Sequence, residues 1–119
     1  MADITSIEEV LSDLENYPGV NEAVLISRSG MHIAGTVPDG AHPETYVAMF
    51  AILLGAAETA ISELKESLDA ILINLEESKV MVVNDGPKAL YVLRLDSDID
   101  LHGLETKLLE TSKSIEQYL

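Results

Sequence analysis

Two glycines, Gly30 and Gly35, are spaced as in the first half of a phosphate-binding loop. Such a loop wraps its backbone N–H groups around phosphates, and it needs a Lys followed by a Ser or Thr directly after the second glycine. Thr36 and Val37 stand at these two positions, so no ammonium group reaches a terminal phosphate. We therefore interpret the glycines as parts of a hairpin and exclude a nucleotide hydrolase of this type.

Three aspartates alternate at Asp96, Asp98 and Asp100, as the oxygen ligands of a calcium loop do. That loop also needs a Gly at its sixth position for a sharp turn and a bidentate Glu at its twelfth. Leu101 and Lys107 occupy these positions, so both features are missing. Carboxylates also cap helices and favour the positive end of the helix dipole. We interpret Asp98 and Asp100 as caps of a following helix.

The other residues that could carry chemistry lack partners at a useful spacing. His32, His42 and His102 are the only histidines, none lies in a pattern such as His-Glu-x-x-His, and we expect them at the surface or at strand edges. The absence of cysteine excludes thiolate nucleophiles, disulfides and zinc sites of the cysteine type. No Ser lies in a Gly-x-Ser-x-Gly elbow, and Glu76-Glu77 falls in an expected turn. The sequence predicts no catalytic residue, no metal site and no cofactor.

The spacing of apolar residues predicts the elements that position any site. Apolar residues at steps of three and four predict helices at residues 4–16, 43–66 and 101–119, whereas short branched or alternating runs predict strands at residues 20–27, 31–37, 70–75, 79–83 and 88–95. A capping box of Ser6 with Glu9, or of Thr5 with Glu8, opens the first helix. Gly35 marks a bulge or a close backbone approach. Tight connections between neighbouring strands predict an α+β fold, an α/β sandwich with a single five-stranded antiparallel sheet in the order α-β-β-α-β-β-β-α.

Composition restricts the class of protein. A length of 119 residues predicts one domain over residues 1–119, and a net charge of −14 excludes nucleic acid and disfavours an anionic membrane surface. A hydrophobic content of 47% is enough for a folded core. The N-terminus lacks a secretory signal, and the longest apolar run, residues 46–57, is well short of the about 20 residues of a membrane span. We expect a cytoplasmic protein without membrane insertion.

The central helix is the most informative element, because its middle has no polar face. One stripe contains Val47, Phe50 and Leu54 and is expected on the sheet. A second stripe is small and consists of Ala48, Ala51, Gly55, Thr59 and Ser62, with Met49, Ile52 and Leu53 between the two. A small stripe that faced water would allow another helix to approach closely, and the simplest candidate is the same helix of a second subunit. The alternative is that the first or last helix of the same chain covers it.

The order of motifs resembles the Roadblock/dynein light chain family. The resemblance begins with a helix that ends in Tyr17-Pro18-Gly19-Val20 and continues with Glu22-Ala23-Val24-Leu25-Ile26-Ser27-Arg28-Ser29-Gly30-Met31-His32-Ile33-Ala34. It continues through Leu53-Leu54-Gly55-Ala56-Ala57-Glu58 in the long helix and through the strands over residues 70–75, 79–83 and 90–95. It covers residues 5–118, nearly the whole chain.

The resemblance implies a profilin-like fold and a homodimer with its central helices side by side and its third strands joined into one sheet. By position, this interface would include Ala48, Ala51, Ile52, Gly55, Thr59 and Ser62 of the helix and Ile71 and Ile73 of the strand. Members of the family serve as scaffolds or regulators of Ras-like small GTPases, and others are dynein accessory chains. Arg28 and Arg94 are the possible arginine fingers, and both lie in or beside expected strands. Control of the GTPase's switch regions is therefore expected rather than insertion of an arginine.

Two other classes of function remain open. A small mixed sheet with helices can enclose a metabolite, which would make the protein a ligand-sensing module. A thioesterase of the hot-dog type would use a helical carboxylate such as Glu58, although two strands precede the long helix where that fold usually has one. The leading interpretation is a non-enzymatic dimeric scaffold that binds a Ras-like small GTPase and influences its nucleotide state or location.

Overall fold

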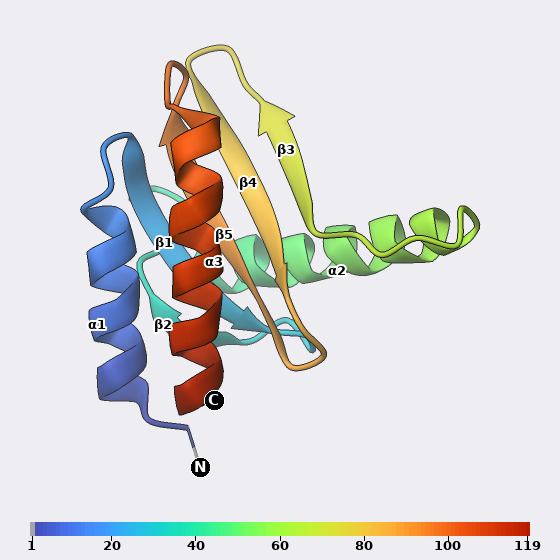
Figure 1. The fold of residues 1–119 in the computed structure, drawn as a ribbon, viewed down its shortest axis with the longest axis horizontal. Coiled ribbons are helices and arrows are strands. Elements are labelled where there is room, and N and C mark those ends of the chain that lie inside the picture. The colour runs from blue at the N-terminus through green and yellow to red at the C-terminus, as the bar shows by residue number, and fades with distance from the viewer. Residues whose placement is uncertain (1) are drawn as a thin grey trace.

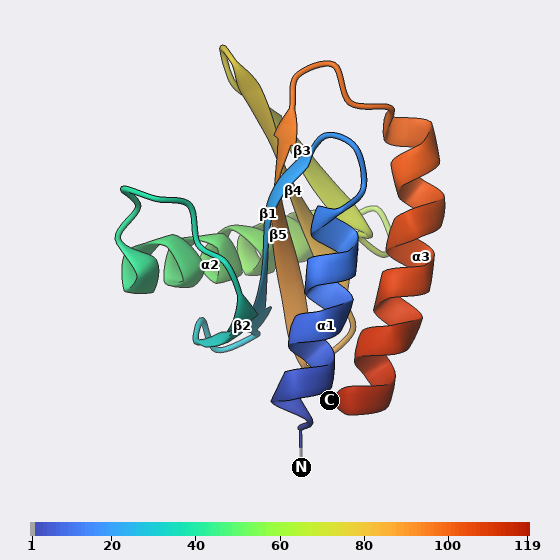
Figure 2. The same cartoon turned by 90° about the vertical axis from the view of Figure 1, so that its left-hand side faces the viewer.

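The computed structural model describes residues 2–119, which form three layers: two helices, a five-stranded sheet and a third helix on its other face (Figures 1 and 2). The helices are α1 (Ile4–Glu15), α2 (Pro43–Ser62) and α3 (Leu101–Tyr118), and the strands are β1 (Val20–Ser27), β2 (His32–Gly35), β3 (Ala70–Asn74), β4 (Ser78–Asp85) and β5 (Ala89–Asp96). Figure 2 shows α1 and α3 on one side of the sheet and α2 on the other. The predicted order of elements and fold class are confirmed.

The strands pair antiparallel in the order β2-β1-β5-β4-β3, with Val92 of β5 opposite both Val24 of β1 and Val82 of β4. β1, β5 and β4 are rich in apolar residues because helices cover both faces of the middle of the sheet. β3 forms one edge, and its side chains alternate between exposed and half-buried. The β3-β4-β5 meander and the β1-β2 hairpin are as predicted.

Alternation along the strands divides the apolar residues into two cores. The core under α1 and α3 contains Ile7, Leu11 and Leu14 of α1, Leu104, Leu108 and Ile115 of α3, and Leu25, Met81, Val83, Tyr91 and Leu93 of the sheet. The core under α2 contains Val47 and Leu54 of α2, and Val24, Ile26, Val80, Val82, Leu90 and Val92 of the sheet. With few aromatic residues, both cores depend on close packing of aliphatic side chains.

The first helix begins at Ile4, within the predicted range, but its cap differs from the prediction. Asp3 is its N-cap, and its carboxylate accepts hydrogen bonds from the Ser6 N–H at 3.1 Å and the Ser6 hydroxyl at 2.8 Å. Neither predicted capping box is the cap, because a carboxylate one residue before the helix already satisfies the free N–H group. Glu8 instead accepts a hydrogen bond from the Gly35 N–H at 3.0 Å.

The second strand is shorter than predicted and ends at Gly35 rather than at residue 37. Gly35 has a φ of +93°, and a Cβ there would lie 2.3 Å from the Ala23 carbonyl oxygen. The predicted close backbone approach is therefore confirmed. The strand also begins at His32 rather than at residue 31: Met31 lies before it with an exposed fraction of 69%, while Ala34 is fully buried.

Further differences lie at the end of α2, in the length of β4 and at the cap of α3, while β3 and β5 differ from the predicted ranges by one residue at their ends. Pro43 starts α2 as predicted, but the helix ends at Ser62 rather than at residue 66, and Lys65 adopts a positive φ of +58°. β4 is longer than predicted and runs from Ser78 to Asp85. Asp100 caps α3 through the N–H groups of His102 and Gly103, whereas Asp98 lies exposed outside the helix and the prediction of a cap there is wrong.

Candidate partner-binding surface

The outward face of α2 is apolar and exposed. Met49, Ile52 and Leu53 have exposed fractions of 52%, 62% and 38%, whereas Val47 and Leu54 are buried against the sheet. Among residues 2–119, α2 is the one helix long and apolar enough to cross a bilayer by length and composition, with a mean hydropathy of 1.5. Exposed apolar surface of this kind marks a place where another molecule packs.

The position of α2 relative to the sheet leaves the C-terminal end of the helix, after Glu58, without support. Its N-terminal half lies on the sheet, where Tyr46 and Phe50 stack edge to face with ring centroids 4.9 Å apart. Its C-terminal end extends past the edge strand β3 (Figure 1). No residue of α2 after Leu54 is buried. The helix and the free edge therefore project on the same side of the molecule.

The predicted small stripe is split by the structure rather than lying on one outward face. Ala48 and Ala51 lie near the turn between β1 and β2, where a Cβ on Gly30 would be 3.7 Å from each of their methyl groups. Gly55 has no atom within 4 Å of an added Cβ. The hydroxyls of Thr59 and Ser62 donate to carbonyls of their own helix, at 3.0 and 2.6 Å, and neither residue is buried. Larger apolar side chains, centred on Ile52, form the outward face instead.

The edge strand β3 lies beside the projecting end of α2. Ile71 and Ile73 are half-buried on the α2 face of the sheet, opposite Val82 and Val80 of β4. Leu72 points to the other face and has an exposed fraction of 39%. The outer backbone groups of β3 pair with no strand of the described chain, which leaves an edge that another strand can extend.

A polar cluster fixes α2 to the sheet. Glu58 of α2 forms an ion pair with Arg28 at the end of β1, and Asn84 of β4 donates to the other Glu58 oxygen at 3.1 Å. Asn84 also donates to the Leu68 carbonyl at 3.0 Å and accepts from Arg28 at 3.3 Å. Arg28 and Glu58 are thus held by each other, and neither is a free arginine finger or a free catalytic carboxylate in this structure.

The second arginine lies on the same face of the sheet, next to the start of α2. Arg94 of β5 pairs with Glu22 of β1 at 3.5 Å, and the other carboxylate oxygen of Glu22 is buried without a hydrogen-bond partner. Burial raises the pKa of Tyr46 above its ordinary value, and the negative charge of Glu22 raises it further. Arg94 and Glu22 therefore lie beside the exposed face of α2 and form its polar border.

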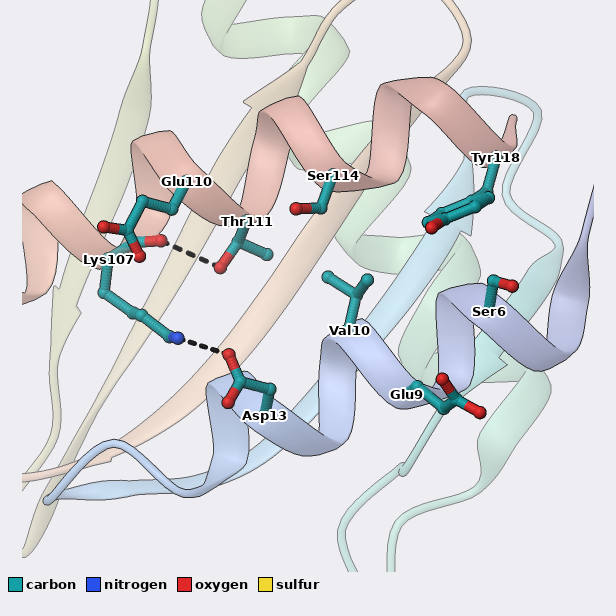
Figure 3. Close-up of a pocket in the computed structure, with 9 residues that line it drawn as sticks. All are labelled: Ser6, Glu9, Val10, Asp13, Lys107, Glu110, Thr111, Ser114 and Tyr118. Carbon is teal, nitrogen blue, oxygen red and sulfur yellow. Dashed lines mark hydrogen bonds and ion pairs between the residues drawn. The ribbon is translucent and has the colours of Figure 1, made fainter.

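The groove between α1 and α3 is polar (Figure 3). An ion pair between Lys107 of α3 and Asp13 of α1 joins the two helices, and Thr111 donates to the Lys107 carbonyl at 2.8 Å. Ser6, Ser114 and Tyr118 line the rest of the groove with two further glutamates. Within residues 2–119, no group of three His, Cys, Asp or Glu side chains is placed to hold a metal ion. His32, His42 and His102 are all exposed, as predicted.

Comparison with known proteins decides the family. The model of the Roadblock/LC7 domain matches residues 6–94. The chain belongs to the Roadblock/LC7 family. The resemblance of the sequence motifs to this family is thereby confirmed. A relative from Methanocaldococcus jannaschii, MJ0714, is 32% identical over 96 residues, which cover 80% of this chain and 80% of the relative.

Solved structures show the same Roadblock fold. The gliding protein MglB from Thermus thermophilus aligns with a TM-score of 0.84 at 22% identity, over 96% of this chain and 88% of that chain. Profilin IB from Acanthamoeba castellanii aligns with a TM-score of 0.66 at 14% identity, over 94% of this chain and 98% of that chain. The profilin-like character of this Roadblock domain is confirmed, and the hot-dog alternative does not agree with this fold.

Proposed function

We propose that this Roadblock protein is a non-enzymatic, cytoplasmic homodimer that binds a Ras-like small GTPase and influences its nucleotide state or location. Membership of the family supports a regulatory role toward small GTPases in general. The observation that carries the proposal is the exposed apolar face of α2 around Ile52. Each Å² of apolar surface that is removed from water contributes about 25 cal/mol, so a partner that covers this face gains binding free energy.

Two features favour a second copy of the chain as the first partner. The C-terminal end of α2 extends past β3, and β3 has a free backbone edge on that same side. If the β3 strands of two copies pair antiparallel about a two-fold axis, the projecting C-terminal end of each α2 reaches across the sheet of the other copy. Ile61, at the end of α2, and the exposed Leu64 beyond it then gain apolar neighbours. Ile71 and Ile73 lie at the strand pairing in this arrangement.

The distribution of charge favours a basic patch on the GTPase. The chain has a net charge of −14, and Arg28 and Arg94 are both engaged in ion pairs. An arginine inserted at the phosphate would have to break such a pair first. We therefore propose that the dimer acts by holding the switch regions of the GTPase in one conformation.

Ile52→Glu tests the dimer, because it places a charge at the centre of the apolar face of α2. We expect sedimentation equilibrium to show a dimer for the unmodified chain and a monomer for this variant. Leu109→Glu is the matched control, because Leu109 of α3 is an apolar residue about as exposed as Ile52. This variant is expected to remain dimeric. A monomeric unmodified chain would contradict the homodimer, and equal masses for the two variants would contradict the apolar face of α2 as its interface.

A pull-down tests the GTPase. The immobilised protein is incubated with the Ras-like GTPases of its own cell, each loaded with GDP or with a non-hydrolysable GTP analogue. We expect retention of at least one GTPase that depends on the nucleotide, and loss of retention with Ile52→Glu. If none binds above the level of an unrelated acidic protein, the proposed function is wrong.

A further inference from the structure

A second groove lies on the face of the sheet opposite α2, between α3 and the β3-β4 side of the sheet. Two adjoining cavities of about 500 and 430 Å³ share Asn84, Leu109 and Ser112 and together form this groove. α1 and α3 cover β1 and β5 on this face, but β3 and the neighbouring side of β4 have no helix above them in the described structure (Figure 1). The groove belongs to one protomer and does not depend on the homodimer proposed above.

The floor and one wall of the groove are apolar. Met81 and Val83 of β4 and Leu108 of α3 retain exposed fractions of 8–9%, so they close the floor without being fully covered. Leu72 of β3 pairs with Met81 across the strands and points to this face. Leu109 of α3 forms the wall and is 69% exposed. An apolar side chain that enters the groove would therefore meet an apolar floor and an apolar wall.

The spacing of helices and strands defines what fits beside α3. α3 lies over β5, where the buried Tyr91 hydroxyl donates to the Leu108 carbonyl at 3.3 Å and lies 2.8 Å from the Ser112 hydroxyl. Packed helices lie about 8–10 Å apart, and neighbouring strands about 4.8 Å apart. The distance between two packed helices therefore equals about two strand spacings. Because α3 lies over β5, a helix packed beside it would lie above β3, two strands away. The layer of α1 and α3 has space for one more helix at that place.

The charge around the apolar floor is mostly negative. Asp69 and Glu105 border the half of the groove over β3, and no Lys or Arg lines that half. Asp85 and Glu116 line the other half, together with Lys88 and Lys113. A helix whose apolar side faces Leu109 and Met81 would place its flanking residues next to Asp69 and Glu105. Basic residues at those positions would gain attraction from both carboxylates.

We propose that the groove between α3 and β3 binds a basic amphipathic helix of a partner protein. The apolar stripe of that helix packs on Leu109, Leu72 and Met81, and its Lys or Arg residues face Asp69 and Glu105. This mode of recognition needs apolar residues at i, i+3, i+4 and i+7 of the partner. It provides the Roadblock domain with a docking site on the face away from α2.

A dye-labelled model peptide tests the proposal. The peptide has Leu at i, i+3, i+4 and i+7 of a helical pattern and Lys and Ala elsewhere, and its binding is measured by fluorescence anisotropy. Leu109→Ser removes the exposed wall, and we expect it to weaken binding about fivefold or more. Met31→Ser is the matched control, because Met31 has the same exposed fraction of 69% and the substitution also leaves the charge unchanged. It is expected to leave the affinity unchanged.

Further measurements distinguish binding in this groove from binding elsewhere on the protein. Glu105→Gln is expected to reduce the dependence of binding on salt, and a peptide with Glu in place of every Lys is expected not to bind. Backbone amide NMR shifts on peptide addition are expected at β3 and α3. The proposal is overturned if no binding occurs up to about 100 μM peptide, or if Leu109→Ser and Met31→Ser act alike. It also fails if the shifts occur on α2, or if Leu109→Ser lowers the sedimentation mass, which would make a second copy the occupant.

Discussion

At the scale of single residues, Gly35 is the position where the fold tolerates no side chain. Its φ of +93° is strained for other residues, and a Cβ would lie 2.3 Å from the Ala23 carbonyl oxygen and 2.9 Å from a Leu11 methyl group. Gly40 has a similar φ of +86° but no atom within 4 Å of such a Cβ. We expect Gly35→Ala to lower the free energy of unfolding by about 2–4 kcal/mol and Gly40→Ala by about 1 kcal/mol, measured by urea unfolding. Equal losses would show that strain, and not contact, decides the effect.

Asp85 is the residue whose negative charge most clearly lowers the stability of the folded state. Burial raises its pKa from 3.8 to about 6, and the charge of Glu116 adds to this, whereas a hydrogen bond from Ser112 opposes it. Because the folded pKa is the higher one, the folded state binds the proton more tightly, and stability falls as pH rises from about 4 to 6. We expect Asp85→Asn to raise the free energy of unfolding by about 1 kcal/mol at pH 7, after discounting for solvent access.

The same substitution is expected to have little effect near pH 4, where the folded protein already carries a protonated Asp85. Urea unfolding at the two pH values measures the difference. Asp98→Asn, in the exposed loop before α3, is the matched control and is expected to change neither value. A gain of stability that is the same at both pH values would contradict a role for the Asp85 charge.

At the scale of elements, α2 carries the proposed association, and Gly55 tests it. No atom lies within 4 Å of a Cβ at Gly55, so the isolated chain accommodates a larger side chain there. In a dimer with paired α2 helices, Gly55→Leu forces about four heavy atoms into a close contact, and we expect association to weaken by about 1–3 kcal/mol. Gly55→Ala adds one carbon and improves helix propensity, so it is expected to weaken association less. Sedimentation equilibrium measures both, and an unchanged dimer with Gly55→Leu would contradict the pairing.

The elements themselves follow from periodicity in the sequence, but their ends do not. Apolar spacing predicts all three helices and five strands because each buries one face or both. The ends depend on contacts between segments that are distant in sequence. β2 ends at Gly35, whose N–H donates to Glu8 of α1, and no local pattern reveals this contact. The choice of Asp3 as the N-cap of α1 does not follow from the sequence because two capping boxes nearby fit the same local rule.

The candidate surfaces are predictable to different degrees. The lack of a polar face on α2 follows from its composition, and the exposure of Met49, Ile52 and Leu53 agrees with it. The direction of the small stripe cannot be predicted, because it depends on how α2 is rotated on the sheet, and Glu58 with Arg28 and Asn84 fixes that rotation. The groove beside α3 has no signal in the sequence. Leu109 is a single exposed leucine in the apolar pattern, and only the uncovered β3 next to it makes a groove.

At the scale of the whole molecule, the two faces of the sheet are prepared for different partners. The α2 face is apolar, contains a projecting helix and lies next to a free strand edge, which favours an identical copy. The α3 face offers a groove with carboxylates at its border, which favours a basic partner. Because the sheet separates the two surfaces, both partners can bind at once. The two proposals together give a domain of this size the role of a junction between a dimer and a third protein.

Net charge provides a test that distinguishes the two kinds of contact. Each chain carries −14, so two copies repel each other, whereas a basic partner is attracted. Salt screens both effects, since the Debye length falls from about 10 Å at 0.1 M to about 3 Å at 1 M. We expect added salt to strengthen the homodimer in sedimentation equilibrium and to weaken the GTPase and basic-helix complexes in anisotropy titrations. Opposite slopes against salt support separate apolar and electrostatic surfaces, while a dimer that dissociates with salt would show that ion pairs hold it together and that the apolar face of α2 does not.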